Sequence, residues 1–150
     1  MDDLRDLYQE IILDHGKNPR NFRHPTDANR AVRGNNPLCG DQLTVYLKLG
    51  DDGVVEDLAF EGKGCAISMA SASMMTELVR GKTADEARAL FEAFHGLVTG
   101  DGTAVGDGEA LEKLQVLSGV RDYPMRVKCA TLAWHALNAA FGGESEVTTE

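Results

Sequence analysis

The sequence contains only three cysteines, and this small, odd number limits what they can do. Three cysteines cannot form a complete set of disulfides within one chain. In a reducing compartment, free thiols persist as core residues, metal ligands or nucleophiles. The function therefore depends on which of these roles belongs to Cys39, Cys65 and Cys129.

The sequence also lacks a long apolar run and an excess of positive charge. No apolar run approaches the roughly 20 residues that span a bilayer, and the start, Met1 to Arg5, has no features of a secretory signal. We therefore expect a cytoplasmic protein with no membrane partner. The net charge of −9 argues against nucleic acid as a partner, because a phosphate backbone is bound by clustered Lys and Arg. The one basic stretch, residues 17–33, is either a solvated loop or a docking surface for an acidic protein.

A length of 150 residues fits one domain, and we expect a single domain over 1–150. Hydrophobic periodicity, turn residues and a capping box at Thr83 and Glu86 divide the chain into elements. In chain order these are a helix ending near residue 15, a long loop over 16–38, a hairpin of strands 42–49 and 54–60, a helix over 66–80, a helix from 83 to about 97, a flexible segment over 100–108, a short helix over 109–117, a helix over 126–141 and a disordered acidic tail over 144–150. The predicted fold class is α+β, a small antiparallel sheet with helices packed on it.

Each cysteine falls at a predicted element boundary. Cys39 lies in the loop that enters the first strand, Cys65 at the start of a helix, and Cys129 in the first turn of the last helix. Helix N-termini present unpaired amides and a positive dipole end, and both stabilise a thiolate. The alternative, that the cysteines are small buried hydrophobic residues, stays open from the pattern alone.

Asp41 follows Cys39 by two residues, and two such residues in an extended strand point to the same side. Three thiolates and one carboxylate would form a tetrahedral site suited to Zn²⁺, although Asp41 could equally be a turn or cap residue. Such a site has a formal charge of −2, which Lys128 and Arg126 could balance. Lys128 could instead be an ordinary solvated lysine.

Over roughly residues 4–141, the sequence resembles the IscU/NifU-N family of iron–sulfur cluster assembly proteins. Three short runs carry this resemblance. They are Asn-Pro-Leu-Cys-Gly-Asp ending at Asp41, Gly-Lys-Gly-Cys-Ala-Ile-Ser around Cys65, and Lys-Cys at Cys129. Lys128 stands where scaffold-type IscU proteins carry histidine, and extra residues lie around 100–122. Both features resemble the SufU branch.

The resemblance implies a SufE/NifU-like α+β sandwich and a zinc-dependent sulfurtransferase with Cys39, Asp41, Cys65 and Cys129 as metal ligands. Its implied partners are a SufS-type cysteine desulfurase, which donates persulfide sulfur, and a SUF scaffold, which receives it. The resemblance also points to a ligand exchange, in which a histidine of the desulfurase replaces one cysteine on the metal.

Sulfur transfer requires a thiolate that attacks the outer sulfur of a persulfide. Cys39 is the predicted acceptor, because it lies in a loop followed by Gly40 whereas the other two cysteines lie at helix starts. Two alternatives remain. The same cysteines could assemble a transient [2Fe–2S] cluster, which Lys128 disfavours by removing a ligand, although Asp41 could substitute for it. Alternatively, the chain could be a non-catalytic, zinc-stabilised adaptor.

Overall fold

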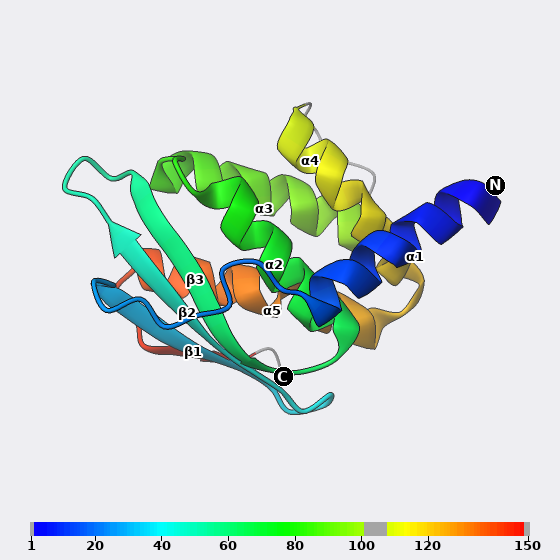
Figure 1. The fold of residues 1–150 in the computed structure, drawn as a ribbon, viewed down its shortest axis with the longest axis horizontal. Coiled ribbons are helices and arrows are strands. Elements are labelled where there is room, and N and C mark those ends of the chain that lie inside the picture. Colours follow the sequence, from blue (N-terminus) through cyan, green and yellow to red (C-terminus); the bar gives the residue numbers. More distant parts are fainter. Residues whose placement is uncertain (1, 101–107, 149–150) are drawn as a thin grey trace.

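The computed structural model describes residues 2–100 and 108–148, which form a four-stranded sheet with helices on one of its faces (Figure 1). The elements, in chain order, are α1 (Asp2–Lys17), β1 (Arg30–Asn36), β2 (Asp41–Leu49), β3 (Val55–Lys63), α2 (Ala66–Val79), α3 (Ala84–Thr99), α4 (Glu109–Leu114), the 3₁₀ helix η1 (Gln115–Asp122), α5 (Pro124–Phe141) and β4 (Glu146–Thr148). The predicted α+β class is confirmed.

The strand order is β3-β2-β1-β4. Strands β1, β2 and β3 pair antiparallel, whereas β4 pairs parallel with β1. The sheet is therefore mixed, and the prediction of a purely antiparallel sheet is wrong at this one edge.

The core lies between the sheet and helices α2 and α5, which pack directly on it. Leu43, Val45 and Leu47 alternate along β2 and point into this core, as the sequence pattern predicts. Trp134 of α5 is fully buried, and its indole N–H donates to Ser71 of α2 at 3.1 Å. This contact links α2, which Cys65 directly precedes, to α5, which carries Cys129.

Strand β1 lies within the segment predicted as a loop over 16–38, so that prediction is wrong for residues 30–36. The inward positions of β1 are Val32, Gly34 and Asn36. Only the first of these is a β-branched, apolar residue of the kind enriched in strands. The alternating pattern that identifies a half-buried strand is therefore too weak to recognise in the sequence.

The C-terminal tail differs from the prediction of disorder over residues 144–148, and residues 149–150 lie outside the described residues. Residues 146–148 form β4, and the backbone N–H of Arg33 donates to the carbonyl of Ser145 at 2.9 Å. The Arg33 guanidinium lies 2.8 Å from a carboxylate oxygen of Glu146. Acidic composition argued for a solvated tail, whereas the open edge of β1 supplies unpaired backbone groups that bind it.

Several predicted boundaries shift by a few residues. The capping box at Thr83 and Glu86 is confirmed. The short helix over 109–117 is instead one α-helical segment followed by the 3₁₀ helix η1. Helix α5 begins at Pro124, two residues before the predicted start, because proline is well suited to the first helical position. Most of the segment predicted to be flexible, 100–108, lies outside the described residues.

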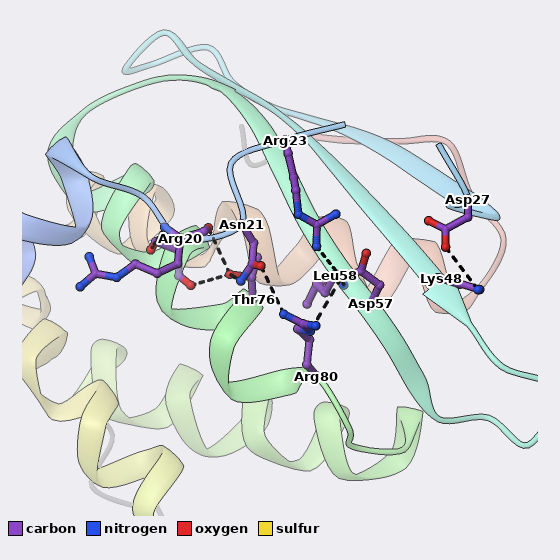
Figure 2. Close-up of polar contacts among 10 residues, drawn as sticks. Arg20, Asn21, Arg23, Asp27, Lys48, Asp57, Leu58, Thr76 and Arg80 are labelled. Carbon is purple, nitrogen blue, oxygen red and sulfur yellow. Dashed lines mark hydrogen bonds and ion pairs between the residues drawn. The ribbon is translucent and has the colours of Figure 1, made fainter. Parts of the chain in front are cut away.

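The basic stretch over residues 17–33 is bound to the rest of the chain. Arg23 lies 2.7 Å from Asp57 of β3, which also faces Arg80 (Figure 2). Asn21 donates to Thr76 of α2 at 3.0 Å. Contacts within the same chain therefore hold the segment between α1 and β1 against α2 and β3. This weakens the interpretation of the stretch as a docking surface.

None of the helices in the described part of the chain is both long enough and apolar enough to cross a membrane.

Candidate metal centre

Three of the four predicted ligands come together at one end of the sheet. The ligand atoms of Cys39, Asp41 and Cys129 lie within 4.8 Å of one another. Asp41 and Cys129 are fully buried and Cys39 is half-buried. The three side chains come from the β1–β2 turn, the first residue of β2 and helix α5, so this cluster exists only in the folded chain.

Cys65 lies beside this cluster and is tied to it in two ways. Its backbone N–H donates to Asp41 Oδ1 at 2.9 Å. Its sulfur accepts a hydrogen bond from the Cys129 thiol. Among the described residues, the group whose ligand atoms lie within 4.8 Å of one another does not include Cys65. This fourth predicted ligand therefore lies next to the other three but outside their group.

The turn that carries Cys39 spans residues 37–40. The carbonyl of Asn36 accepts hydrogen bonds from the backbone N–H groups of Cys39, at 3.3 Å, and Gly40, at 2.9 Å. Gly40 has φ of +73°, a conformation that favours glycine. Cys39 is therefore in a tight turn, and the predicted extended geometry from Cys39 to Asp41 is wrong. The turn, instead of strand alternation, brings their side chains together.

Cys65 is the N-cap residue of α2, as predicted. Its Sγ accepts a hydrogen bond from the backbone N–H of Ser68 at 3.5 Å. The hydrogen bond from the Cys129 thiol lowers the pKa of Cys65 to about 6, and the Ser68 amide acts in the same direction. Cys65 is thus the thiolate of the pair at neutral pH.

Cys129 does not have the predicted environment of a helix start. Because α5 begins at Pro124, Cys129 lies in its second turn, and its thiol also donates a hydrogen bond to the carbonyl of Met125, with 3.5 Å from sulfur to oxygen. The hydrogen bond to Cys65, together with burial, raises the pKa of Cys129. The prediction that the helix N-terminus stabilises a thiolate here is wrong, and Cys129 is the thiol that donates to Cys65.

Asn36 is a site residue that the sequence reasoning did not identify. It is fully buried, and its side-chain amide lies 3.4 Å from Asp41 Oδ2 and 3.6 Å from Cys129 Sγ. In the sequence it was only one of several polar residues of a predicted loop. Recognition of β1 would have revealed it, because Asn36 and Asp41 are paired residues of β1 and β2.

The donor set fits zinc. Sulfur ligands with one carboxylate suit Zn²⁺, whereas Mg²⁺ and Ca²⁺ require shells of oxygen. Asn36 Oδ1 and Ser68 Oγ are buried next to the cluster without a hydrogen-bond partner among the described residues. Such polar atoms mark a centre built for a polar occupant instead of a sealed apolar core.

Of the two predicted charge-balancing residues, Arg126 lies against the sulfur atoms. The charge of the Cys65 thiolate and a hydrogen bond to Cys129 raise the pKa of Arg126. Lys128 is half-buried beside Cys129 in the sequence, but adjacent residues of a helix are about 100° apart around its axis. Its part in charge balance stays a prediction.

The fold and the cysteine cluster define a class of protein that comparison identifies. Residues 7–130 match the family model of the NifU-like N-terminal domain, and the chain belongs to this family. It is similar to the zinc-dependent sulfurtransferase SufU of Bacillus subtilis, with 44% identity over 94% of this chain and 93% of the relative. It is also similar to the iron–sulfur cluster assembly scaffold protein IscU of Streptococcus pyogenes, with 42% identity over 91% of this chain and 84% of the relative.

Solved structures agree with this assignment. A NifU-like N-terminal protein from Brucella abortus superposes with a TM-score of 0.82 and 31% identity, covering 93% of this chain and 95% of that one. The FiSufU protein of Fervidobacterium islandicum AW-1, described as a scaffold protein for the SUF system, gives a TM-score of 0.80 and 35% identity over 91% and 97% of the two chains. The predicted family and sandwich fold are both confirmed.

Proposed function

We propose that this chain is a zinc-dependent sulfurtransferase of iron–sulfur cluster assembly. It accepts persulfide sulfur from a SufS-type cysteine desulfurase and passes it to a SUF scaffold. The observation that carries the proposal is the convergence of Cys39, Asp41 and Cys129, with Cys65 tied to the same cluster. The similarity to the zinc-dependent sulfurtransferase SufU of Bacillus subtilis supports it.

In this proposal zinc is held by Cys39, Asp41, Cys65 and Cys129. Bound zinc keeps cysteine ligands deprotonated at neutral pH. The chain supplies the rest: the Cys65 N–H orients the Asp41 carboxylate, and Arg126 offsets the excess negative charge of the sulfurs. With all four ligands charged, the net charge of the ligands and Zn²⁺ together is −2, so a cation next to the sulfurs stabilises the centre.

Cys39 is the proposed sulfur acceptor. It is half-buried and lies in a turn, whereas Cys129 is fully buried in α5. The Cys39 thiolate attacks the outer sulfur of the donor persulfide, a new S–S bond forms at Cys39, and the donor cysteine leaves as a thiolate that keeps the electron pair of the broken S–S bond. In this proposal Cys39 detaches from the centre by movement of the turn over residues 37–40.

Exposed apolar residues around the centre support docking of a protein partner. Leu38 beside Cys39 is 56% exposed, and Tyr123 and Met125 at the start of α5 are 64% and 52% exposed. Lys63 and Arg126 are exposed in the same sequence neighbourhoods as Cys65 and Cys129. In a chain of net charge −9, apolar residues and cations near the acceptor favour a desulfurase surface with acidic residues around an apolar contact.

A second candidate is assembly of a transient [2Fe–2S] cluster on the same residues. It is favoured by the similarity to the Streptococcus pyogenes protein, which is described as a scaffold. Metal analysis of protein purified without oxygen distinguishes the two. About one zinc per chain is expected for the sulfurtransferase, and iron with acid-labile sulfide is expected for the scaffold.

The test of the proposed function combines zinc analysis with a desulfurase assay. We expect the wild-type chain to stimulate a SufS-type desulfurase and to carry a persulfide afterwards. Asp41→Ala should lose zinc and stimulation, whereas Asp51→Ala, at an exposed turn, should keep both. Cys39→Ser should keep the fold and accept no sulfur. Acceptance at the wild-type rate by Cys39→Ser would contradict the assignment of the acceptor.

A further inference from the structure

We propose that Asn36 is the positioning residue of this metal centre. One residue organises three of the four proposed ligands: its side-chain amide holds Asp41 and Cys129, and its backbone carbonyl holds the turn of Cys39. The inference rests on the proposed function, because it takes the zinc centre as given. It adds a residue that binds no metal and yet fixes where the ligands stand.

The side-chain contacts place the Asn36 amide between two ligands from distant parts of the chain. Nδ2 lies 3.4 Å from Asp41 Oδ2 and 3.6 Å from Cys129 Sγ, and the latter is a normal distance for a hydrogen bond to sulfur. All three residues are fully buried. The amide therefore connects β2 to α5 at the centre without competition from solvent.

The backbone of Asn36 acts on the third ligand. Its carbonyl accepts from Cys39 and Gly40, which closes the turn that carries the proposed sulfur acceptor. The pairing of Asn36 with Asp41 at the end of the β1–β2 ladder fixes its position. A single residue thus sets the turn and the two buried ligands relative to each other.

The chemistry of the neighbours determines which side of the carboxamide faces them. A carboxylate and a thiolate accept hydrogen bonds and donate none. Only the NH₂ group of Asn36 can therefore face both when the centre is charged. Each N–H donor that faces Asp41 or Cys129 also spreads part of the negative charge of the centre, in the same way that other outer groups orient and tune metal ligands.

Two substitutions separate this role from a structural one. Asn36→Leu keeps the approximate volume and the backbone carbonyl but removes both donors. Asn36→Asp keeps the shape and places an acceptor against Asp41 and Cys129. Asn35→Ala is the matched control, because it removes an exposed amide from the same strand.

We expect zinc affinity, measured by competition with a chelator, to fall about 10- to 100-fold in Asn36→Leu, the usual effect of losing an outer hydrogen bond to a metal ligand. The decrease should be larger in Asn36→Asp and absent in Asn35→Ala. With Co²⁺ in place of zinc, the sulfur-to-cobalt charge-transfer band should shift in both Asn36 variants. A purely structural role would not move this band in a folded variant.

Wild-type protein loaded with ¹¹³Cd provides a test that needs no variant. A scalar coupling between the Asn36 side-chain amide proton and cadmium, transmitted through Cys129 Sγ, is expected. Absence of this coupling, or unchanged zinc affinity and cobalt spectra in both Asn36 variants, would overturn the inference. So would a loss of affinity matched by equal destabilisation of the metal-free chain. If wild-type protein binds no zinc, the proposed function fails instead.

Discussion

At the scale of single residues, Cys65 and Cys129 differ in their protonation, because the pKa of Cys65 is lowered and that of Cys129 is raised. Cys65 caps α2 and accepts from the Ser68 amide, whereas Cys129 is buried within α5 and donates to Cys65. The two sulfurs have therefore different roles before any metal binds. In the proposed zinc centre, binding through Cys129 would remove its proton, so we expect proton release on loading with zinc.

The first prediction concerns the thiolate of Cys65. The structure lowers its pKa from 9.0 to about 6, so the metal-free chain should show one thiolate by ultraviolet absorbance with a midpoint near that value. A lowered pKa for an acid contributes stability that is fully present above the ordinary value of 9.0 and is lost as the pH falls through about 6. The raised pKa of Cys129 acts oppositely, and its contribution is lost as the pH rises above 9.0.

The controls for this titration are two variants that each remove a different cysteine. Cys39→Ser should retain the absorbance step at low pH, because the hydrogen bonds that lower the pKa of Cys65 come from Cys129, Ser68 and Ile67. Cys65→Ser should lose that step. A metal-free wild-type chain whose thiolates all appear near the ordinary pKa of cysteine would show that the Cys129 thiol does not donate to Cys65.

The second prediction concerns Gly64, which lies against Asp41. A Cβ at this position would be 2.5 Å from Asp41 Oδ1 and 3.1 Å from Asp41 Cγ. Because the Asp41 side chain is short and bound to Cys65, Gly64→Ala must displace the carboxylate. We expect zinc affinity to fall by about tenfold or more, as for other disturbed metal ligands. Gly119→Ala, where a Cβ would meet nothing within 4 Å, should leave the affinity unchanged.

At the scale of elements, the sequence predicts those parts of the fold that have strong periodicity. The β2–β3 hairpin, α2 and α3 were predicted within a few residues, because alternating apolar positions and the Thr83 capping box are local signals. Strands β1 and β4 were missed because their identity comes from pairing with neighbours. In β1, Gly34 and Asn36 occupy inward positions where a typical strand has apolar side chains.

The candidate site, like the fold, was predicted where local signals were strong and missed where it depends on contacts between distant residues. Cys39, Asp41 and Cys129 are chemically distinctive, so their residue types indicated a metal site before their positions were known. Asn36 was missed because an asparagine in a predicted loop carries no signal until β1 is paired with β2. The protonation state of Cys129 was predicted wrongly. It depends on where α5 starts and on the contact of Cys129 with Cys65.

The third prediction concerns the packing of α1 on α2. The buried ring of His15 makes a hydrogen bond of 2.7 Å with Ser73 Oγ, which also accepts from the Arg20 N–H. Burial, and then the charge of Arg20, lower the pKa of His15, although Glu77 and Asp14 act oppositely. A lowered pKa for a base contributes stability that is present above the ordinary value of 6.5 and is lost as the pH falls below it.

The measurement is the free energy of unfolding in denaturant at about pH 7.5 and about pH 5.5, on either side of the ordinary histidine value. The wild-type chain should be less stable at the lower pH, and His15→Gln should reduce this difference. His24→Gln is the control, because His24 is exposed and stacks on Tyr46. Burial also lowers the pKa of His135, so part of the difference should remain. An unchanged difference in His15→Gln would refute the prediction.

At the scale of the whole molecule, the centre depends on contacts between distant parts of the chain. Its four candidate ligands span residues 39–129. Three of them meet and Cys65 lies beside them, because α2 and α5 pack on the same face of the sheet (Figure 1). Zinc that binds this arrangement and not the unfolded chain stabilises the whole fold. Strand β4 is a smaller and more local element, because its three residues pair with β1 and contact α5.

The fourth prediction concerns a chain that ends at Glu144 and so lacks β4. The truncation removes the hydrogen bond from Arg33 to Ser145 and the ion pair between Arg33 and Glu146, whose side chains are 74% and 68% exposed. Exposed ion pairs contribute little, so a loss of about 1 kcal/mol in the free energy of unfolding is expected. Hydrogen exchange at the Arg33 amide should become faster. Zinc affinity should stay within about twofold of the wild-type value, because Asn36 pairs with Asp41 of β2 and not with a residue of β4.

Glu146→Gln separates the two contributions of β4. It removes the ion pair and keeps the backbone pairing of β1 with β4, so its stability should be close to that of the wild type and exchange at Arg33 should stay slow. A truncated chain with wild-type exchange at Arg33 would show that β4 does not pair with β1 in solution. A truncated chain with greatly reduced zinc affinity would show that β4 holds β1, and through it Asn36, in place. Loss of stability without loss of zinc affinity is therefore the result expected if the pairing of β1 with β2 positions Asn36 without help from β4.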